Sequence, residues 1–227
     1  MTSDPTAPTA PPESRESVAD ALARRVTARE GPAANVVVQG LHELGAVDRA
    51  VYAAVARTPT GTLDEPVRRL SAAADKSKLW LGIAAVVAVV GGKRGRRAAL
   101  EGVMAVGVSS ATINLGVKQV ARRRRPDRVR PAVFEDRHVP MPGSTSFPSG
   151  HAASAFAFAY AVGRHVPALA VPIRLLAAAV AYSRVHTGVH YPGDVVIGSV
   201  TGAGTAAMVA AVADRAARSR AVSGRAR

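Results

Sequence analysis

The chain has 227 residues, no cysteine, a formal net charge of +14 and a hydrophobic content of 48%. This length suits one domain, and the lack of cysteine excludes disulfide bonds and thiolate metal sites. The charge alone would suit a nucleic-acid-binding protein, but the arginine clusters lie between long runs of Ala, Val, Gly and Leu, a pattern typical of membrane proteins beside anionic lipids.

Two regions precede the most apolar part of the sequence. Residues 1–33 are rich in Pro, Ser and Thr, cannot bury a core and are predicted to be a disordered tail. They lack the basic-then-apolar pattern of a signal peptide. Residues 34–78 carry apolar side chains at helical spacing among charged ones, such as Val36, Leu44 and Val51. This pattern predicts an amphipathic helical region, with a surface-lying helix or helical hairpin over residues 34–58. Residues 63–78 are predicted to form a second, polar helix that leads to the membrane.

Five apolar segments follow, at residues 79–92, 98–117, 151–166, 168–182 and 195–213. The first is short against the ~20 residues of a typical spanning helix, and the others come closer to that length. The sequence therefore predicts an all-α integral membrane bundle of five spans, or six if a further segment within residues 34–56 inserts. Residues 79–213 form this membrane domain, and residues 214–227 form a basic C-terminal tail.

Polar residues gather where four of these segments end or begin. Their spacing is K-x6-R-P from Lys118 to Pro126, P-S-G-H from Pro148 to His151, and S-R-x5-H-x3-D from Ser183 to Asp194. In an up-and-down bundle these four segment ends lie at the same membrane face. The motif residues are therefore predicted to meet at one site.

The residue types in these motifs suit a phosphate ester. Lys118, Arg125 and Arg184 supply an ammonium and two guanidinium forks, which match a dianionic phosphoryl group. Ser149 and Gly150 open a helix whose free N–H groups and dipole favour an anion, although Ser149 could equally be a simple N-cap. With three cations supplied by the protein, no metal or other cofactor is expected.

Two histidines could carry the chemistry. His190 and Asp194 are four residues apart, so the carboxylate can hold one imidazole nitrogen and leave the other basic. If Asp194 only complemented a helix dipole, His190 would be left without a role. His151 lies in the first turn of a helix, where a phosphate would be held, and its alternative is a solvated histidine at a helix end.

The three motifs, complete and in order, resemble the signature of the type 2 phosphatidic acid phosphatase and vanadium haloperoxidase superfamily, over about residues 79–213. The resemblance implies a membrane phosphatase acting on a lipid-linked phosphate or pyrophosphate, of the phosphatidic acid or polyprenyl phosphate class. It implies that His190 is the nucleophile, forming a phosphohistidine, and that His151 protonates the leaving group. It assigns phosphate binding to Lys118, Arg125, Ser149, Gly150 and Arg184.

Other functions stay open at this level. A vanadate-dependent haloperoxidase would use the same anion pocket, but such proteins are soluble and larger. A non-catalytic lipid-phosphate binder would need neither His190 nor His151. A nucleic-acid-binding protein would not need bilayer-length apolar segments, and high salt would release it from membranes.

The resemblance also favours a multi-pass cell-membrane protein with its site on the extracytoplasmic side. Basic residues flank both ends of the segments, so the positive-inside rule is nearly balanced. The run Arg122–Arg124 is predicted to be a membrane-surface or substrate-attracting patch rather than part of the site. Asn114 is expected to face the bundle interior. Gly198 and Gly202 predict close helix packing, either within the bundle or between subunits of a homo-oligomer.

Overall fold

The computed structural model of the protein describes residues 32–121, 123–129 and 133–225. All regular elements in these ranges are helices and no strand occurs among them, which confirms the all-α prediction. The predicted tail at residues 1–33 lies almost entirely outside the described residues.

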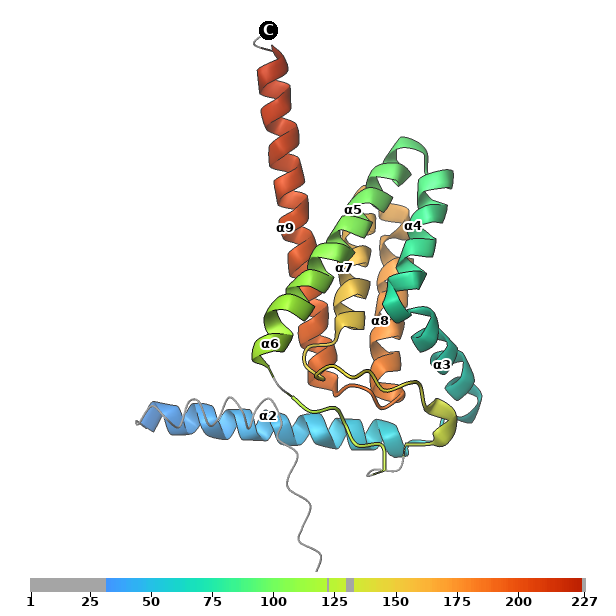
Figure 1. The fold of residues 1–227 in the computed structure, drawn as a ribbon, viewed down its shortest axis with the longest axis vertical. Coiled ribbons are helices and arrows are strands. Elements are labelled where there is room, and N and C mark those ends of the chain that lie inside the picture. Colours follow the sequence, from blue (N-terminus) through green and yellow to red (C-terminus); the bar gives the residue numbers. More distant parts are fainter. Residues whose placement is uncertain (1–31, 122, 130–132, 226–227) are drawn as a thin grey trace, which may run out of the picture.

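Five helices form a bundle (Figure 1). They are α4 (Lys78–Val90), α5 (Gly92–Ala111), α7 (Gly150–His165), α8 (Pro167–His186) and α9 (Pro192–Arg225). Helix α7 is central, in contact with α5, α8 and α9. Its small buried residues, such as Ala153 and Ala157, let these neighbours approach closely. Larger side chains fill the core toward α4, where the ring centroids of Trp80 and Phe158 lie 5.3 Å apart.

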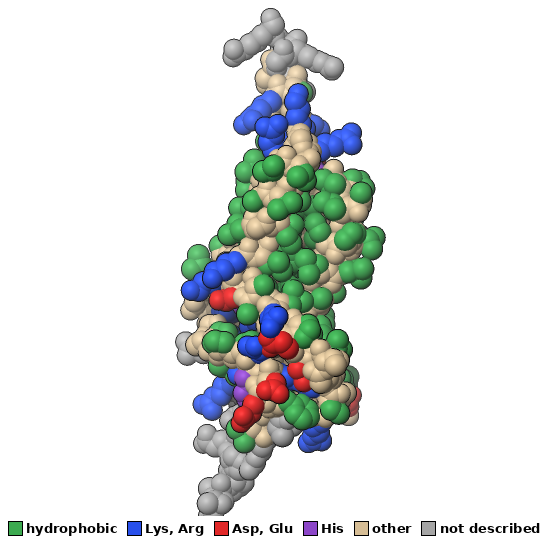
Figure 2. Space-filling view, turned by 90° about the vertical axis from the view of Figure 1, so that its right-hand side faces the viewer, with side chains coloured by type: hydrophobic (Ala, Val, Ile, Leu, Met, Phe, Trp, Pro, Cys, Tyr) green, Lys and Arg blue, Asp and Glu red, His purple; other side chains and the backbone are tan. Residues whose placement is uncertain are grey.

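Large apolar side chains are exposed on helices α4, α5, α8 and α9. By length and composition, three helical segments can cross a membrane: Gly92–Val120, Pro167–His186 and Pro192–Ala221. Helices α4 and α7 have 13 and 16 residues and are shorter than a usual span of about 20 residues. Figure 2 shows hydrophobic side chains covering the middle of the molecule, with Lys and Arg at one end and charges of both signs toward the other. This distribution suits a protein embedded in a bilayer.

The end of α5 departs from regular α-helix. A π-helical segment (Thr112–Val117) links α5 to the short α6 (Lys118–Val120). A π turn adds residues to the helical repeat and so rotates the side chains that follow. The Asn114 side chain is exposed and donates to the Ser110 carbonyl at 2.9 Å. The prediction that Asn114 faces the bundle interior is therefore wrong.

Helix α2 (Pro32–Arg57) lies across one end of the bundle and is a single helix rather than a hairpin (Figure 1). One face, which includes Tyr52 and Ala56, is buried against the rest of the protein. A neighbouring face exposes large apolar side chains, namely Val36, Leu44, Val47 and Val51. This arrangement is amphipathic, as the sequence indicates for this region.

A buried polar cluster fixes α3 (Asp64–Ala73) beside α8. The Asp64 carboxylate accepts a hydrogen bond from Arg137 Nε at 2.9 Å and lies 3.0 Å from His186 Nε2. Arg137 also donates to the carbonyls of Val55 and Thr58, at 3.1 and 2.6 Å. These contacts bring the first turn of α3 next to the last turn of α8.

Glycines bring α9 into backbone contact with α7. A Cβ atom added at Gly198 would overlap the Ser149 carbonyl, and one added at Gly202 would overlap the Ala153 carbonyl. The two helices also share a hydrogen bond from Ser149 N to the Asp194 carbonyl, 2.9 Å long. Packing within the bundle is therefore the role of these glycines.

Candidate active site

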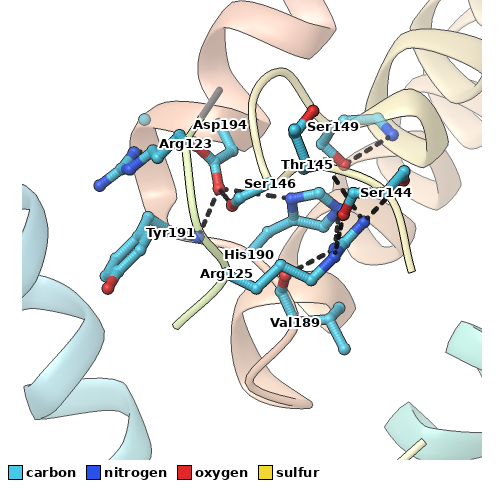
Figure 3. Close-up of polar contacts among 12 residues, drawn as sticks. Arg123, Arg125, Ser144, Thr145, Ser146, Ser149, Val189, His190, Tyr191 and Asp194 are labelled. Atoms are coloured by element: carbon cyan, nitrogen blue, oxygen red, sulfur yellow. Dashed lines mark hydrogen bonds and ion pairs between the residues drawn. The ribbon is translucent and has the colours of Figure 1, made fainter. Parts of the chain in front are cut away.

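The three motifs meet at the end of the bundle that α2 crosses (Figures 1 and 3). Lys118 follows the π turn, and Arg184 lies in the last turn of α8. His151 lies in the first turn of α7, and Asp194 lies in the first turn of α9. The Ser149 N–H donates to the Asp194 carbonyl at 2.9 Å, and Arg125 Nη1 lies 3.2 Å from His190 Nε2. The structure thus brings the predicted site residues together from four different helix ends.

His190 and Asp194 form a buried pair (Figure 3). Their side chains are 1% and 0% exposed, and His190 Nδ1 lies 3.3 Å from Asp194 Oδ2. Arg125 Nη1 lies 3.2 Å from His190 Nε2. A guanidinium can only donate, so Nε2 is the acceptor and the imidazole proton is on Nδ1, facing the carboxylate. This tautomer leaves the Nε2 lone pair as the group that can attack phosphorus.

Burial sets the charge of His190. Loss of solvent, reinforced by the positive charges of Arg125 and Arg184, lowers the pKa of His190 to about 4 against the opposing pull of Asp194. The imidazole is therefore neutral at neutral pH. Neutrality is the state a nitrogen nucleophile requires.

Arg125 is fixed by bonds to the backbone. It donates from Nε to the Ser144 carbonyl at 2.9 Å and from Nη1 to the Val189 carbonyl at 2.8 Å. Burial lowers the pKa of Arg125 to about 10, which still leaves the guanidinium charged at neutral pH. The Ser144 hydroxyl accepts from Lys118 Nζ at 3.1 Å and from Arg125 Nη2 at 3.2 Å. Ser144 therefore connects two of the predicted phosphate-binding cations, although no motif pointed to it.

Two buried nitrogen atoms at the site lack a hydrogen bond within the described residues. Arg184 donates from Nη1 to Ser71 Oγ at 2.5 Å, while its Nε has no partner. His151 Nε2 also has none, and its nearest carboxylate oxygen, Oδ1 of Asp75, is 3.5 Å away. Buried donors without partners are costly. An anion bound at this site could satisfy both atoms.

Ser149 and Gly150 open α7 as the sequence indicates. The Ser149 hydroxyl accepts from Ala152 N at 3.4 Å, so this side chain is an N-cap. At Gly150, an added Cβ would meet only Ile113, at 3.9 Å. Protein packing therefore does not demand glycine here, and the open backbone leaves space for a ligand.

The run Arg122–Arg124 requires a correction. Arg122 lies outside the described residues, and Arg124 is exposed. Arg123 has a side chain only 3% exposed and forms ion pairs with Asp194 and Asp48, at 2.8 and 2.6 Å. The prediction of a membrane-surface patch is therefore wrong for Arg123. Nothing in a run of identical residues distinguishes the buried one.

Metal ligands do not gather in the part of the chain that the structure describes. No group of three or more His, Cys, Asp or Glu residues there could hold a metal ion. The cationic side chains of the motifs are the groups available for phosphate charge. Metal independence stays a prediction, tested below.

Comparisons with known proteins agree with the motifs. A family model described as the PAP2 superfamily matches residues 98–218. A protein of Mycobacterium tuberculosis named decaprenylphosphoryl-5-phosphoribose phosphatase is 38% identical over 133 residues, which are 59% of this chain and 71% of that protein. A protein of Mycolicibacterium smegmatis with the same name is 37% identical over 153 residues, which are 66% and 77% of the two chains.

Two solved structures share the fold. The transmembrane PAP2-type phosphatidylglycerolphosphate phosphatase of Bacillus subtilis aligns with a TM-score of 0.59 and 21% identity, over 87% of this chain and 94% of its own. Aquifex aeolicus LpxE aligns with a TM-score of 0.58 and 19% identity, over 72% and 94% of the two chains. At these identities the likeness concerns the arrangement of helices.

Proposed function

The chain belongs to the PAP2 superfamily and is a membrane-type phosphoric ester hydrolase, and from this premise we propose a phosphatase acting on a lipid-linked phosphate or pyrophosphate. The observation that carries the proposal is the buried His190–Asp194 pair, in which His190 Nε2 is unprotonated and accepts a hydrogen bond from Arg125. A lipid-phosphate binder without catalysis would need cations but no oriented nucleophile. The presence of both the cations and an oriented His190 supports hydrolysis.

The names of two relatives support a more specific proposal for the substrate. The mycobacterial proteins are named as phosphatases of decaprenylphosphoryl-5-phosphoribose, which joins a polyprenyl chain to a sugar phosphate. We therefore propose a polyprenyl-linked phosphate ester as the substrate. Phosphatidic acid is the alternative substrate against which it is tested. The purified protein should release phosphate faster from a polyprenyl-phosphoryl pentose phosphate than from phosphatidic acid. Faster release from phosphatidic acid would instead indicate a glycerolipid phosphate as the substrate.

The proposed reaction has two steps. His190 Nε2 attacks phosphorus while the bond to the leaving oxygen breaks, and His151, protonated in the complex with the anionic substrate, gives that oxygen a proton. Water then attacks the phosphohistidine, the P–N bond breaks, and His151 takes the proton from the water. Lys118, Arg125 and Arg184 stabilise the charge on the other phosphoryl oxygens in both steps. Asp194 holds the Nδ1 proton throughout.

Chelation and vanadate test this mechanism. Phosphate release should be unaffected by excess EDTA, because side chains and backbone N–H groups supply all the charge stabilisation. Vanadate should inhibit, since it adopts the trigonal bipyramidal geometry of the transferred group. Both are measured as phosphate release in detergent. Activity that vanishes with EDTA and returns with magnesium would contradict the mechanism.

We also propose the finer membrane arrangement. Helices α4, α5, α7, α8 and α9 are the five spans, the shorter α7 being enclosed by α5, α8 and α9. Helix α2 lies at the interface with its exposed apolar face in the lipid. Residues 1–33, 34–78, 79–213 and 214–227 remain the proposed tail, interfacial region, membrane domain and basic tail. The turn opposite the site carries Lys93, Arg94, Arg96 and Arg97, all exposed. This turn supports a cytoplasmic position for that end and an extracytoplasmic site.

Introduced cysteines test the orientation, since the natural chain has none. Gly143 is an exposed residue near the site with open space around its Cα, and Ala217 is exposed near the opposite end of α9. A membrane-impermeant thiol reagent should label Gly143→Cys in intact cells. It should label Ala217→Cys only after the membrane is opened. The opposite pattern would place the site in the cytoplasm.

A further inference from the structure

The carboxylate that orients His190 is itself held by a second group of residues (Figure 3). Asp194 Oδ2 accepts from Tyr191 N at 2.9 Å and from the Ser146 hydroxyl, in addition to its contact with His190. Its other oxygen, Oδ1, accepts from Arg123 Nη1 at 2.8 Å. Arg123 is thus the cationic partner of the oxygen that does not face His190.

Arg123 is immobilised by two further contacts. Its Nη2 donates to Asp48 Oδ2 of helix α2 at 2.6 Å. The guanidinium carbon lies 3.9 Å from the centroid of the Tyr191 ring. With its side chain 3% exposed, the guanidinium is held between one ring and two carboxylates. Such a bridge fixes both the position and the plane of the fork.

Asp48 also holds the turn that leads into α9. Its Oδ1 accepts from Gly193 N at 2.7 Å, so one carboxylate binds both Arg123 and the residue before Asp194. Nearby on α2, Tyr52 donates to the Asp127 carbonyl at 3.0 Å and packs edge-on against Tyr191, with centroids 5.3 Å apart. Helix α2 is therefore docked onto the two segments that surround the nucleophile.

We propose that Arg123, held by Asp48, is a positioning residue for the reaction, and that α2 is consequently part of the catalytic unit. This inference rests on the proposed role of His190 as nucleophile. A buried carboxylate with one oxygen unpaired would turn or take up a proton, and either change would release the Nδ1 proton of His190 from its acceptor. Residues 98–218, matched by the family model, do not include α2, so this support comes from outside the matched region.

Substitutions at Arg123 and its exposed neighbour Arg124 separate this role from a general effect of charge. Arg123→Gln is expected to lower kcat about 10²-fold, while KM and the inhibition constant of vanadate change less than about twofold, because the phosphate-binding cations remain. Arg123→Lys keeps the charge and should recover part of kcat. Arg124→Gln, which removes a neighbouring exposed charge, should leave kcat and KM unchanged.

A combined variant shows whether Arg123 acts through the carboxylate. In an Asp194→Asn background, adding Arg123→Gln should change kcat less than about twofold, because the partner it positions is already lost. Asp48→Asn preserves size and should lower kcat roughly tenfold on its own. A residue that only stabilised the fold would instead lower the thermal unfolding temperature and give losses that add.

Several results would overturn the proposal. Arg123→Gln protein that unfolds at the wild-type temperature and keeps more than half of wild-type kcat would do so, as would additive losses in the Asp194→Asn background. If Arg123→Gln fails to accumulate, Asp48→Asn decides, and unchanged kcat in that variant overturns the role of α2. Failure of the proposed function is a separate outcome, recognised when the wild-type protein releases no phosphate from any lipid phosphate.

Discussion

Replacement of His190 by alanine is expected to lower phosphate release at least about 10⁴-fold on every substrate, whatever its leaving group. Among the described residues, only the His190 imidazole has one nitrogen (Nδ1) beside a carboxylate and the other (Nε2) beside Arg125. No other group there is placed to form the covalent intermediate. The measurement is initial rate in detergent on an alkyl phosphate and on p-nitrophenyl phosphate.

His151→Ala is the matched comparison, because the two histidines should respond differently to the leaving group. On an alkyl phosphate it should lose about 10² to 10⁴-fold, the usual contribution of a general acid. On p-nitrophenyl phosphate, whose leaving group needs little protonation, the first step should recover much of this loss. The recovery could be confined to a burst of p-nitrophenolate, since water attack on the phosphohistidine also uses His151.

The reverse pattern would exchange the two roles. If the good leaving group rescues His190→Ala and not His151→Ala, the nucleophile is His151. Asp194→Asn provides a further check, because it should give a milder form of the His190 loss by disturbing the tautomer and leaving the nucleophile in place.

Gly202→Ala is expected to destabilise the protein by about 3 kcal/mol or more. Its new methyl group would overlap the Ala153 carbonyl, and backbone atoms cannot turn aside as a flexible side chain can. Gly204→Ala is the matched control, because nothing lies within 4 Å of the position that its Cβ would occupy. There the substitution should be neutral or stabilising by up to about 1 kcal/mol.

Thermal unfolding in detergent, followed by loss of helical signal, measures both glycine variants. Activity of Gly202→Ala should fall with stability, because separation of α7 from α9 also separates Ser149 from Asp194. Equal unfolding temperatures for the two variants would mean that α7 and α9 do not meet through these glycines.

The sequence predicts the helices of the bundle well because each helix is marked by residues that are adjacent in the chain. Runs of apolar residues mark each helix, and the ends of those runs carry the motif residues, so an antiparallel arrangement brings Lys118, His151, Arg184 and Asp194 to one end. Close approach of α7 and α9 is likewise signalled by Gly198 and Gly202, four residues apart on one helix face.

What the sequence does not predict depends on tertiary contacts. Arg123 resembles its neighbours in the arginine run, and its partner Asp48 is 75 residues away on helix α2. Asn114 lies in a π-helical segment, and no residue type in that segment predicts a π turn. Ser144 lies in a loop outside every motif, and only the folded chain brings it between Lys118 and Arg125.

The phosphate-binding cations also have a kinetic consequence. Among the described residues, no carboxylate forms an ion pair with Lys118, Arg125 or Arg184, which leaves these cations available to a bound anion. Inorganic phosphate, the second product, carries the same charges as the group that was transferred. The cations that attract the substrate therefore also slow the dissociation of inorganic phosphate. We therefore expect the dissociation of inorganic phosphate to limit turnover, and phosphate on the same side of the membrane as the site to inhibit the enzyme.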